Sequence, residues 1–475
     1  MYLGIDLGTG SVKVMRLDRS GRERTASRAY PVETPAPGHS ESDPATWRQA
    51  LQTALSAVGD LSQISAVGLS GQMHGVVPVT RSTSGKIAAI RSAILWSDGR
   101  GAESLSAYEA LPRDITQDLA NIPAAGMAGP TLLWLLQHEQ QTLQRADYSL
   151  FPKDYIRADL TGEIATDFSD ASGSLLYSFS TRDWHQQLLR QFGLPPSLLP
   201  PIRSSTEVAG TVTAAAATFY GLPEGVPVSV GAGDTPAAMY GTGLVNPTIA
   251  QVSVGTAAQV SRALDLPHEI PPISSLNLFE GAAPGSRFQV AAMLNGGLAL
   301  EWVKERLGFS WTDLYARLDG STTDDPGELL FLPYLSGERT PFMNPHARGA
   351  WVGLSRYDTN DSLARAALLG VACTVRLGLE TLENGRPPAR SVRLVGGSAR
   401  FKEWRRILAM ILDRPLLYSE QSDSSARGAA FTAARAVSSE VPPVPPFSSE
   451  DPVSAPWVTA HYDRFLQVYQ ALNSQ

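Results

Sequence analysis

Two strand–turn–strand segments of similar design lie about half a chain apart in this sequence of 475 residues. In each segment, two short apolar runs typical of strands flank a tight turn that contains a glycine–threonine pair. The first turn contains Gly8 and Thr9, and the second contains Gly255 and Thr256. The strand-like runs are residues 2–5, 12–17, 251–254 and 258–261. This repetition indicates two related domains that face each other, or else the coincidence of two common turn types.

The N-terminal half alternates helix-like and strand-like segments. Residues 44–57 have the pattern of a helix and residues 64–69 that of a strand, which together favour an α/β fold built in layers. A boundary follows a short helix near residues 241–245. We therefore predict an N-terminal domain over residues 1–243 and a C-terminal domain over residues 244–475.

Charge and cysteine content limit the class of protein. The formal net charge of −7 argues against nucleic acid as the main partner, because a phosphate backbone requires a basic face. The single cysteine, Cys373, allows no intrachain disulfide and is consistent with a reducing compartment. The chain does not open with a signal-peptide pattern and has no run of 18 apolar residues. We expect a cytoplasmic protein that does not span a membrane.

The turn after the first strand suits a phosphate group. Its small residues allow a ligand to approach the backbone, whose N–H groups can point at phosphate oxygens. Lys13 could add a positive charge, and Asp6 at the strand end could hold Mg²⁺ through water. The glycine–lysine–serine/threonine spacing of a Walker loop is missing. An ordinary hairpin turn is the alternative interpretation.

Asp234 follows a strand-like run and a pair of glycines, and precedes a helix whose first turn contains Pro236. Asp234 or Thr235 could simply cap that helix. A carboxylate at a helix N-terminus also stays ionised, and the glycines leave room for a substrate. Asp234 is therefore a candidate general base as well as a candidate cap.

Two further turns contain small residues next to polar ones. Residues 70–75 follow a strand and include Gln72, Met73 and His74, which could clamp a polyhydroxylated ligand, although a lone histidine is more often structural. Residues 396–400 join a strand to a helix and could let a nucleobase lie on the backbone, or could form a plain turn. The loop at residues 331–341 is rich in polar and ring side chains, but its residues alone indicate no role. Metal-ligand spacings such as CxxC or HExxH are absent from the sequence.

Taken in order, these segments resemble the FGGY family of carbohydrate kinases, and within it the xylulose kinases, from residue 2 to about residue 433. The matching segments are residues 4–13, 71–75, 94–100, 152–155, 231–234, 253–257, 334–341 and 396–400. The resemblance implies an α/β fold of two ribonuclease-H-like domains, of the actin and hexokinase type, on either side of an active-site cleft. It also implies that the N-terminal domain binds the sugar and that the C-terminal domain binds the nucleotide.

The resemblance further implies ATP-dependent phosphorylation of D-xylulose to D-xylulose 5-phosphate by in-line transfer, with Asp234 as base and Asp6 placing Mg²⁺ and ATP. The implied sugar-binding residues are Gln72, Met73, His74, Trp96, Asp98 and Asp234. The implied nucleotide-binding residues are Gly8, Thr9, Lys13, Gly255, Thr256, Gly296, Gly397, Ser398 and Arg400. We consider a homodimer as the assembly. The alternatives are a kinase for another ketose or a polyol, such as ribulose, and a degenerate homologue that only binds sugar or nucleotide.

Several positions depart from the family pattern and motivate these alternatives. Thr131 stands where the family usually has lysine, and Thr235 where xylulose kinases tend to have asparagine. Ser398 replaces a glycine, and Ser362 occupies a position that is normally acidic or amide. Residues 424–428 lack the usual Gly-Pro-Ala-Leu-Gly character. The candidate base and both phosphate turns remain intact, so we expect activity.

Overall fold

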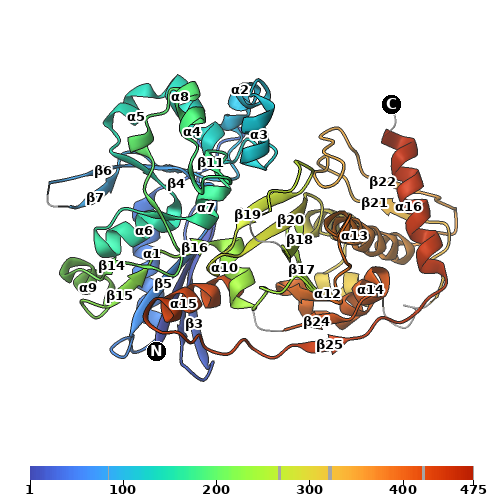
Figure 1. Ribbon diagram of the computed structural model, residues 1–475. Helices are drawn as coiled ribbons and strands as arrows, with labels where there is room; N and C mark the ends of the chain where they lie inside the picture. The colour runs from blue at the N-terminus through green and yellow to red at the C-terminus, as the bar shows by residue number, and fades with distance from the viewer. Residues whose placement is uncertain (84, 266–268, 319–323, 420–422, 474–475) are drawn as a thin grey trace.

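A mixed β-sheet forms the centre of the N-terminal domain (Figure 1). The computed structural model describes residues 1–83, 85–265, 269–318, 324–419 and 423–473. The sheet has the order β14-β15-β5-β1-β2-β3, in which β1 is antiparallel to β2 and parallel to β5. The strands are β1 (Tyr2–Leu7), β2 (Ser11–Leu17), β3 (Glu23–Ala29), β5 (Ala66–Gly71), β14 (Val208–Thr211) and β15 (Pro227–Ser229), with β16 (Ala232–Gly233) beside β5.

Helices and small sheets surround this central sheet. Every residue of β1 is buried, because the strand lies in the middle of a sheet covered on both faces. The helices are α1 (Pro44–Ala57), α2 (Leu105–Glu109), α3 (Arg113–Leu119), α4 (Ala128–His138), α5 (Gln140–Arg145), α6 (Pro152–Thr161), α7 (Phe168–Ser172), α8 (Gln186–Phe192), α9 (Ala214–Tyr220) and α10 (Asp234–Gly241). The small sheets pair β4 (Glu41–Ser42) with β8 (Ala93–Ile94), β7 (Ile87–Ala89) and β9 (Tyr148–Leu150) with β6 (Val77–Arg81), β10 (Thr166–Asp167) with β13 (Ile202–Arg203), and β11 (Tyr177–Ser178) with β12 (Asp183–Trp184).

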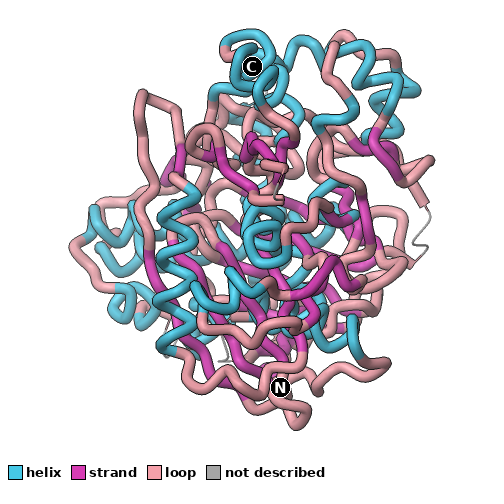
Figure 2. Tube along the Cα trace, turned by 90° about the vertical axis from the view of Figure 1, so that its left-hand side faces the viewer, coloured by secondary structure: helices cyan, strands magenta, loops and turns pink. Residues whose placement is uncertain are grey.

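The C-terminal sheet has the order β19-β20-β18-β17-β23-β24-β25. Its strands are β17 (Ile249–Val254), β18 (Ala258–Ala263), β19 (Asn277–Glu280), β20 (Arg287–Met293), β23 (Ser391–Val395), β24 (Leu416–Tyr418) and β25 (Ser448–Glu450), and β21 (Leu330–Leu332) pairs separately with β22 (Ala350–Val352). The helices are α11 (Gly297–Leu307), α12 (Trp311–Ala316), α13 (Asn360–Glu383), α14 (Lys402–Leu412), α15 (Ser424–Val437) and α16 (Trp457–Asn473). In a view turned by 90°, the strands run through the interior with helices around them (Figure 2).

The two sheets share one topology. In each sheet, three antiparallel strands are followed by two parallel ones: β3-β2-β1-β5-β15 in the first and β20-β18-β17-β23-β24 in the second. The two glycine–threonine turns therefore occupy equivalent places, between β1 and β2 and between β17 and β18. This arrangement confirms the predicted α/β fold of two related domains.

One helix of the described residues, α13, is long and apolar enough to cross a membrane by length and composition. Its most apolar window has a mean hydropathy of 1.4, but 72% of that window is buried inside the protein. It packs in the hydrophobic core of the C-terminal domain, where its residue Cys373 is fully buried, as expected for a small core residue.

Helix α15 returns from the C-terminal half and covers the N-terminal sheet (Figure 1). Its alanines and Phe431 pack against Tyr2, Leu17 and Ala66. The approach is close because the strands carry glycine: a Cβ on Gly4 would lie 1.9 Å from the carbonyl oxygen of Ala426, and one on Gly68 equally close to that of Ala429. The N-terminal domain is thus completed by a late segment of the chain.

Candidate active site

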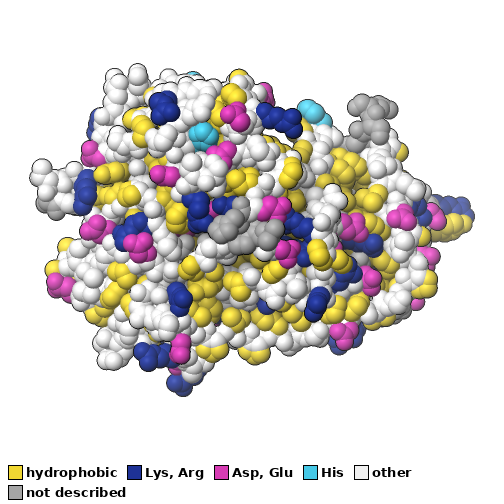
Figure 3. All heavy atoms as spheres, viewed as in Figure 1, with side chains coloured by type: hydrophobic (Ala, Val, Ile, Leu, Met, Phe, Trp, Pro, Cys, Tyr) yellow, Lys and Arg dark blue, Asp and Glu magenta, His cyan; other side chains and the backbone are white. Residues whose placement is uncertain are grey.

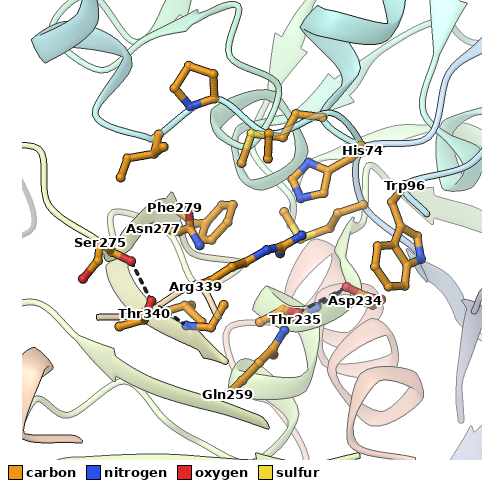
Figure 4. Close-up of a pocket in the computed structure, with 18 of the residues that line it drawn as sticks. His74, Trp96, Asp234, Thr235, Gln259, Ser275, Asn277, Phe279, Arg339 and Thr340 are labelled. Atoms are coloured by element: carbon orange, nitrogen blue, oxygen red, sulfur yellow. Dashed lines mark hydrogen bonds between the residues drawn. The ribbon is translucent and has the colours of Figure 1, made fainter. Parts of the chain in front are cut away.

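A cavity of about 260 Å³ opens between the two domains (Figure 4). The N-terminal domain contributes polar and sulfur-containing groups from the ends of β1 and β5 and from the start of α10. The C-terminal domain contributes residues of β18, β19 and β20 and of the loop after β21. The lining includes Thr9, Met73, His74, Trp96, Asp234, Thr235, Gln259, Asn277, Phe279, Arg339 and Thr340.

Asp234 is the first residue of helix α10 and lines this cavity. The expected capping role is wrong: Gly233 is the N-cap, with no side-chain capping bond, because the helix already begins at Asp234. The carboxylate Oδ1 instead accepts hydrogen bonds from the Thr235 N–H at 2.6 Å and the Thr235 hydroxyl at 3.3 Å. Protein surrounds the carboxyl group and Asp6 lies near it, and these two effects raise its pKa to about 7, against the opposing Thr235 bonds.

The turn after β5 delivers Met73 and His74 to the cavity. His74 has a positive φ of 69°, and burial together with the neighbouring Arg339 charge lowers its pKa to about 4, although a bond to Gly173 opposes this. The imidazole is therefore neutral at pH 7. Gln72 lies beneath the cavity wall, buried, with its Nε2 3.5 Å from the Gly8 carbonyl oxygen. It contacts the first phosphate turn rather than the cavity.

Trp96 and Asp98 were predicted together but have different surroundings. Trp96 is 46% exposed, lines the cavity, and donates from Nε1 to the Thr9 hydroxyl at 2.9 Å. Asp98 is buried outside the cavity lining, where it accepts from the Ser40 N–H at 2.6 Å and from Arg100 Nε at 2.8 Å. The geometry therefore does not bring Asp98 to the sugar side, because its carboxylate organises a neighbouring loop.

A second cavity, of about 250 Å³, lies beside the first phosphate turn. Asp6, Lys13 and Gly397 line it together with the start of α15. Lys13 Nζ forms an ion pair of 2.8 Å with Asp423, and Asp6 accepts from the Ser70 hydroxyl at 3.0 Å. Burial raises the pKa of Asp6 to about 6, against the lowering effects of Ser70 and Lys13.

The turn between β17 and β18 is exposed and packs on the start of α11. The Gly297 N–H donates to the Gly255 carbonyl at 2.7 Å, and the Leu298 N–H donates to that of Thr256 at 2.9 Å. Gly296 is buried against the same turn, where a Cβ would lie 2.7 Å from backbone atoms. Gly255, Thr256 and Gly296 are thus brought together, but they line neither of these two cavities.

The turn at residues 396–400 is only partly directed at the second cavity. Gly397 is exposed and lines that cavity. Ser398 is buried, and its hydroxyl has no hydrogen-bond partner among the described residues, whereas the guanidinium of Arg400 lies over the Phe401 ring at 4.7 Å. The structure therefore places Gly397, rather than Ser398 or Arg400, at the candidate nucleotide cavity.

A buried ionic cluster lies directly behind the Asp234 turn. Lys153 Nζ is 2.6 Å from Asp154, 3.0 Å from Asp167 and 3.0 Å from Asp170, all on fully buried side chains. Arg157 adds a second cation, 2.6 Å from Asp154. Burial raises the pKa of Asp170 well above its usual value, against the opposing Lys153 charge.

This cluster is connected to the turn through hydrogen bonds. The Ser169 hydroxyl donates to Asp167 at 2.6 Å and accepts from the Gly233 N–H at 2.9 Å. Through Ser169, Asp167 of the cluster is thereby connected to Gly233, the residue that precedes the candidate base.

Several polar residues of the cavity were missed by the sequence-based prediction. Gln259, Asn277 and Arg339 come from the C-terminal domain and point their side chains into the cavity (Figure 4). One signal was available for Gln259, since it stands between the buried Ala258 and Val260 of a correctly predicted strand.

Several of the residues that depart from the family pattern, though not Ser398, have local partners. Thr131 is buried on α4 and donates to the Met127 carbonyl at 3.2 Å. Ser362 completes a capping box at the start of α13, a role in which its hydroxyl replaces the usual acidic or amide group. Arg427, within residues 424–428, pairs with Glu23 at 2.7 Å and lines the second cavity.

The donor set at the junction of the cavities is compatible with Mg²⁺. The negative charge of Asp6 contributes to raising the pKa of Asp234, so a cation near the two carboxylates would offset this repulsion. Mg²⁺ typically uses one or two carboxylates together with water and phosphate oxygens. Among the described residues, no group of three or more histidine, cysteine or acidic side chains could hold a metal ion by itself.

Comparison with known proteins gives matches over most of the chain. The chain is 35% identical over 439 residues to a xylulose kinase of Escherichia coli, covering 92% of this chain and 89% of that protein. It is 34% identical over 446 residues to a xylulose kinase of Klebsiella pneumoniae, covering 93% and 91%. A crystal structure of a "xyloylose kinase" from Brucella ovis superposes with a TM-score of 0.91 at 33% identity, covering 100% and 98%.

Family models divide the chain at the same place as its two sheets. Residues 1–241 match the N-terminal domain of the FGGY family of carbohydrate kinases, and residues 250–437 match its C-terminal domain. Together with the superposed structure, these matches confirm the expected actin- and hexokinase-like fold. The chain belongs to the FGGY family of carbohydrate kinases.

Proposed function

We propose that the protein transfers the terminal phosphoryl group of ATP to the terminal hydroxyl of D-xylulose, giving D-xylulose 5-phosphate and ADP. The observation that carries this proposal is the position of Asp234, which lines the larger cavity within electrostatic reach of Asp6 in the neighbouring one. Asp234 can thus serve an acceptor in the first cavity, while Asp6 serves a nucleotide in the second. The names of the relatives from Escherichia coli and Klebsiella pneumoniae support xylulose as the acceptor.

Asp234 acts as the general base. Its carboxylate orients the acceptor hydroxyl and takes the proton as the new O–P bond forms, while the electron pair of the breaking P–O bond leaves with ADP. A pKa near 7 keeps about half of this group ionised at neutral pH, and makes its conjugate acid a ready proton donor to solvent after transfer. Met73, His74 and Trp96 surround the acceptor, with Gln72 supporting the loop from below.

Charge on the transferred group requires neutralisation. Lys13, which lines the second cavity, and backbone N–H groups of the two glycine–threonine turns would contact the phosphates, and Gly397 would lie against the nucleoside. Mg²⁺, when bound with ATP, supplies Lewis-acid neutralisation of the phosphate oxygens, and Asp6 would hold it through water. Closure of the domains excludes water as a competing acceptor. A cytoplasmic location and a homodimeric assembly are further parts of this proposal.

A coupled assay of ADP release tests the proposal. We expect D-xylulose to give kcat/KM at least about tenfold above D-ribulose and the pentitols. Asp234→Asn should reduce sugar-dependent turnover by at least about 100-fold, whereas Glu224→Gln, a matched change at an exposed acid, should not. A higher kcat/KM with another acceptor would reassign the substrate, and a folded Asp234→Asn enzyme with near wild-type turnover would disprove the base.

A further inference from the structure

Arg339 extends a cation into the acceptor cavity (Figure 4). It is the only lysine or arginine among the residues that line this cavity, and Asp234 is the only acid among them. Within the described residues, no hydrogen bond or ion pair joins the Arg339 guanidinium to a protein group. Its neighbour Glu338 is engaged elsewhere, accepting from the backbone N–H groups of Leu294 at 2.6 Å and of Arg339 itself at 2.7 Å. The guanidinium is therefore available to a ligand.

The backbone that carries this side chain is firmly held. The Thr340 hydroxyl donates to the Ser275 carbonyl at 2.6 Å, and the Thr340 N–H donates to that of Ala292 at 3.1 Å. On the other side, Asn295 Nδ2 donates to the Gly337 carbonyl at 2.6 Å. A side chain whose backbone is anchored on both sides in this way can bind a ligand group at a fixed position.

The Arg339 side chain extends across the cavity toward His74 (Figure 4). Its charge contributes to lowering the pKa of His74, whereas the pKa of Asp234 responds chiefly to burial, Asp6 and Thr235. A sugar whose reacting hydroxyl contacts Asp234 therefore extends its opposite end toward Arg339. In an open-chain 2-ketose that reacts at its 5-hydroxyl, the opposite end carries the keto oxygen.

The guanidinium is a pure hydrogen-bond donor, with five N–H groups and no acceptor. A carbonyl oxygen only accepts, so the two groups are complementary. A polyol presents at the same carbon a hydroxyl, whose own hydrogen needs an acceptor that Arg339 cannot supply. The neighbouring His74 is neutral and adds no competing positive charge.

From this arrangement we infer that Arg339 determines acceptor specificity by binding the keto oxygen of the sugar, and so favours a ketose over the polyols obtained from it by reduction. This inference rests on the proposed function and adds a residue outside the expected sugar-binding set. A carboxylate also only accepts hydrogen bonds, so Arg339 could equally bind the carboxylate of a sugar acid. The experiment below therefore compares the ketose with a sugar acid.

The test compares dissociation constants, measured by calorimetry, for D-xylulose, its reduction products xylitol and D-arabitol, and the sugar acid D-xylonate. The proteins are the wild type, Arg339→Gln, Arg339→Lys, and Arg356→Gln as a control at an exposed arginine. We expect Arg339→Gln to weaken D-xylulose binding by about 10- to 100-fold, as for loss of a hydrogen bond from a charged group, and polyol binding by less than about threefold. Arg339→Lys should weaken D-xylulose binding by an intermediate factor, because lysine keeps the positive charge but lacks the planar, forked set of N–H donors of the guanidinium.

In steady-state kinetics, Arg339→Gln should raise KM for D-xylulose, while kcat and the KM for ATP change little. D-Xylonate that binds the wild type more tightly than D-xylulose, and loses this advantage in Arg339→Gln, would support the shared chemistry with a carboxylate as the preferred ligand. Equal losses for ketose and polyols, or no loss for either, would overturn the inference. Failure of the proposed function has a different result, since the wild type would then release no ADP with D-xylulose.

Discussion

The indole N–H of Trp96 donates a hydrogen bond to the hydroxyl of Thr9 at 2.9 Å. Trp96 follows β8 on the acceptor side, whereas Thr9 belongs to the turn between β1 and β2. On the other side of that turn, the Tyr30 hydroxyl donates to the Gly8 carbonyl. The turn between β1 and β2 is therefore held from two directions, and one of the two contacts comes from a residue that lines the interdomain cavity.

Trp96→Phe should impair both substrates. The variant keeps an aromatic ring at the cavity but loses the bond to Thr9, which is worth about 1 kcal/mol, or roughly a fivefold effect. We expect kcat/KM for D-xylulose and for ATP each to fall about five- to tenfold in steady-state kinetics. Trp311→Phe, on α12 and outside the cavity lining, is the control. A change confined to the sugar would show that the bond does not order the phosphate turn.

Asp234→Asn should stabilise the fold at alkaline pH. The folded-state pKa of about 7 exceeds the ordinary value of 3.8, so ionisation is disfavoured in the native state. The resulting cost to stability appears as pH rises above 3.8 and is complete above pH 7. We expect the variant to melt at least about 2 °C higher than the wild type at pH 8, and by a smaller margin at pH 4. Equal shifts at both pH values, or a shift in Glu224→Gln, would contradict this origin.

Thr235→Val should move the acidic limb of the pH–rate profile to higher pH. The Thr235 hydroxyl bonds to the Asp234 carboxylate and lowers its pKa, and valine removes that bond while it leaves the backbone N–H. A base must be ionised to act, so kcat/KM rises through the pKa of the free enzyme, near 7 in the wild type. A limb that stays in place or moves to lower pH would exclude Asp234 as the group that titrates.

The buried cluster should respond asymmetrically to mutation. It holds three carboxylates against two cations, so Lys153→Met leaves uncompensated charge and should cost about 3–5 kcal/mol of unfolding free energy. Asp170→Asn instead removes the surplus carboxyl charge at nearly constant shape and should cost much less, about 1 kcal/mol or below. Urea denaturation measures both. Similar losses in the two variants would show that Asp170 is as fully compensated as its neighbours.

Local patterns were sufficient to find the hairpins and the turns that carry Asp6, Met73, His74 and Asp234. Each lies where a strand ends in small residues, and such a segment bends in nearly the same way whatever surrounds it. Helix α1 was predicted with its observed bounds because Asp43 caps it and Pro44 starts it. These features depend on neighbours a few residues away.

Features that depend on distant residues were not predicted. The family resemblance implied that Asp98 is a sugar ligand, but its carboxylate accepts a hydrogen bond from the N–H of Ser40, 58 residues earlier. Arg339 enters the cavity only because Thr340 is anchored to β20 and to Ser275, which no local pattern reveals. The polar composition of residues 331–341 marked the loop as unusual, but it did not indicate that the loop faces the cavity.

The position of α15 against β1 and β5 has a consequence for synthesis of the protein. Residues 424–437 are synthesised after all the strands of the N-terminal sheet. Until they are made, the sheet surface around Gly4 and Gly68, which α15 later covers, is exposed to solvent. The N-terminal domain then cannot reach its native form during translation, and chaperones would encounter it incomplete. When the chain is cut at the domain boundary, the N-terminal fragment should become well folded only after it is mixed with the C-terminal fragment.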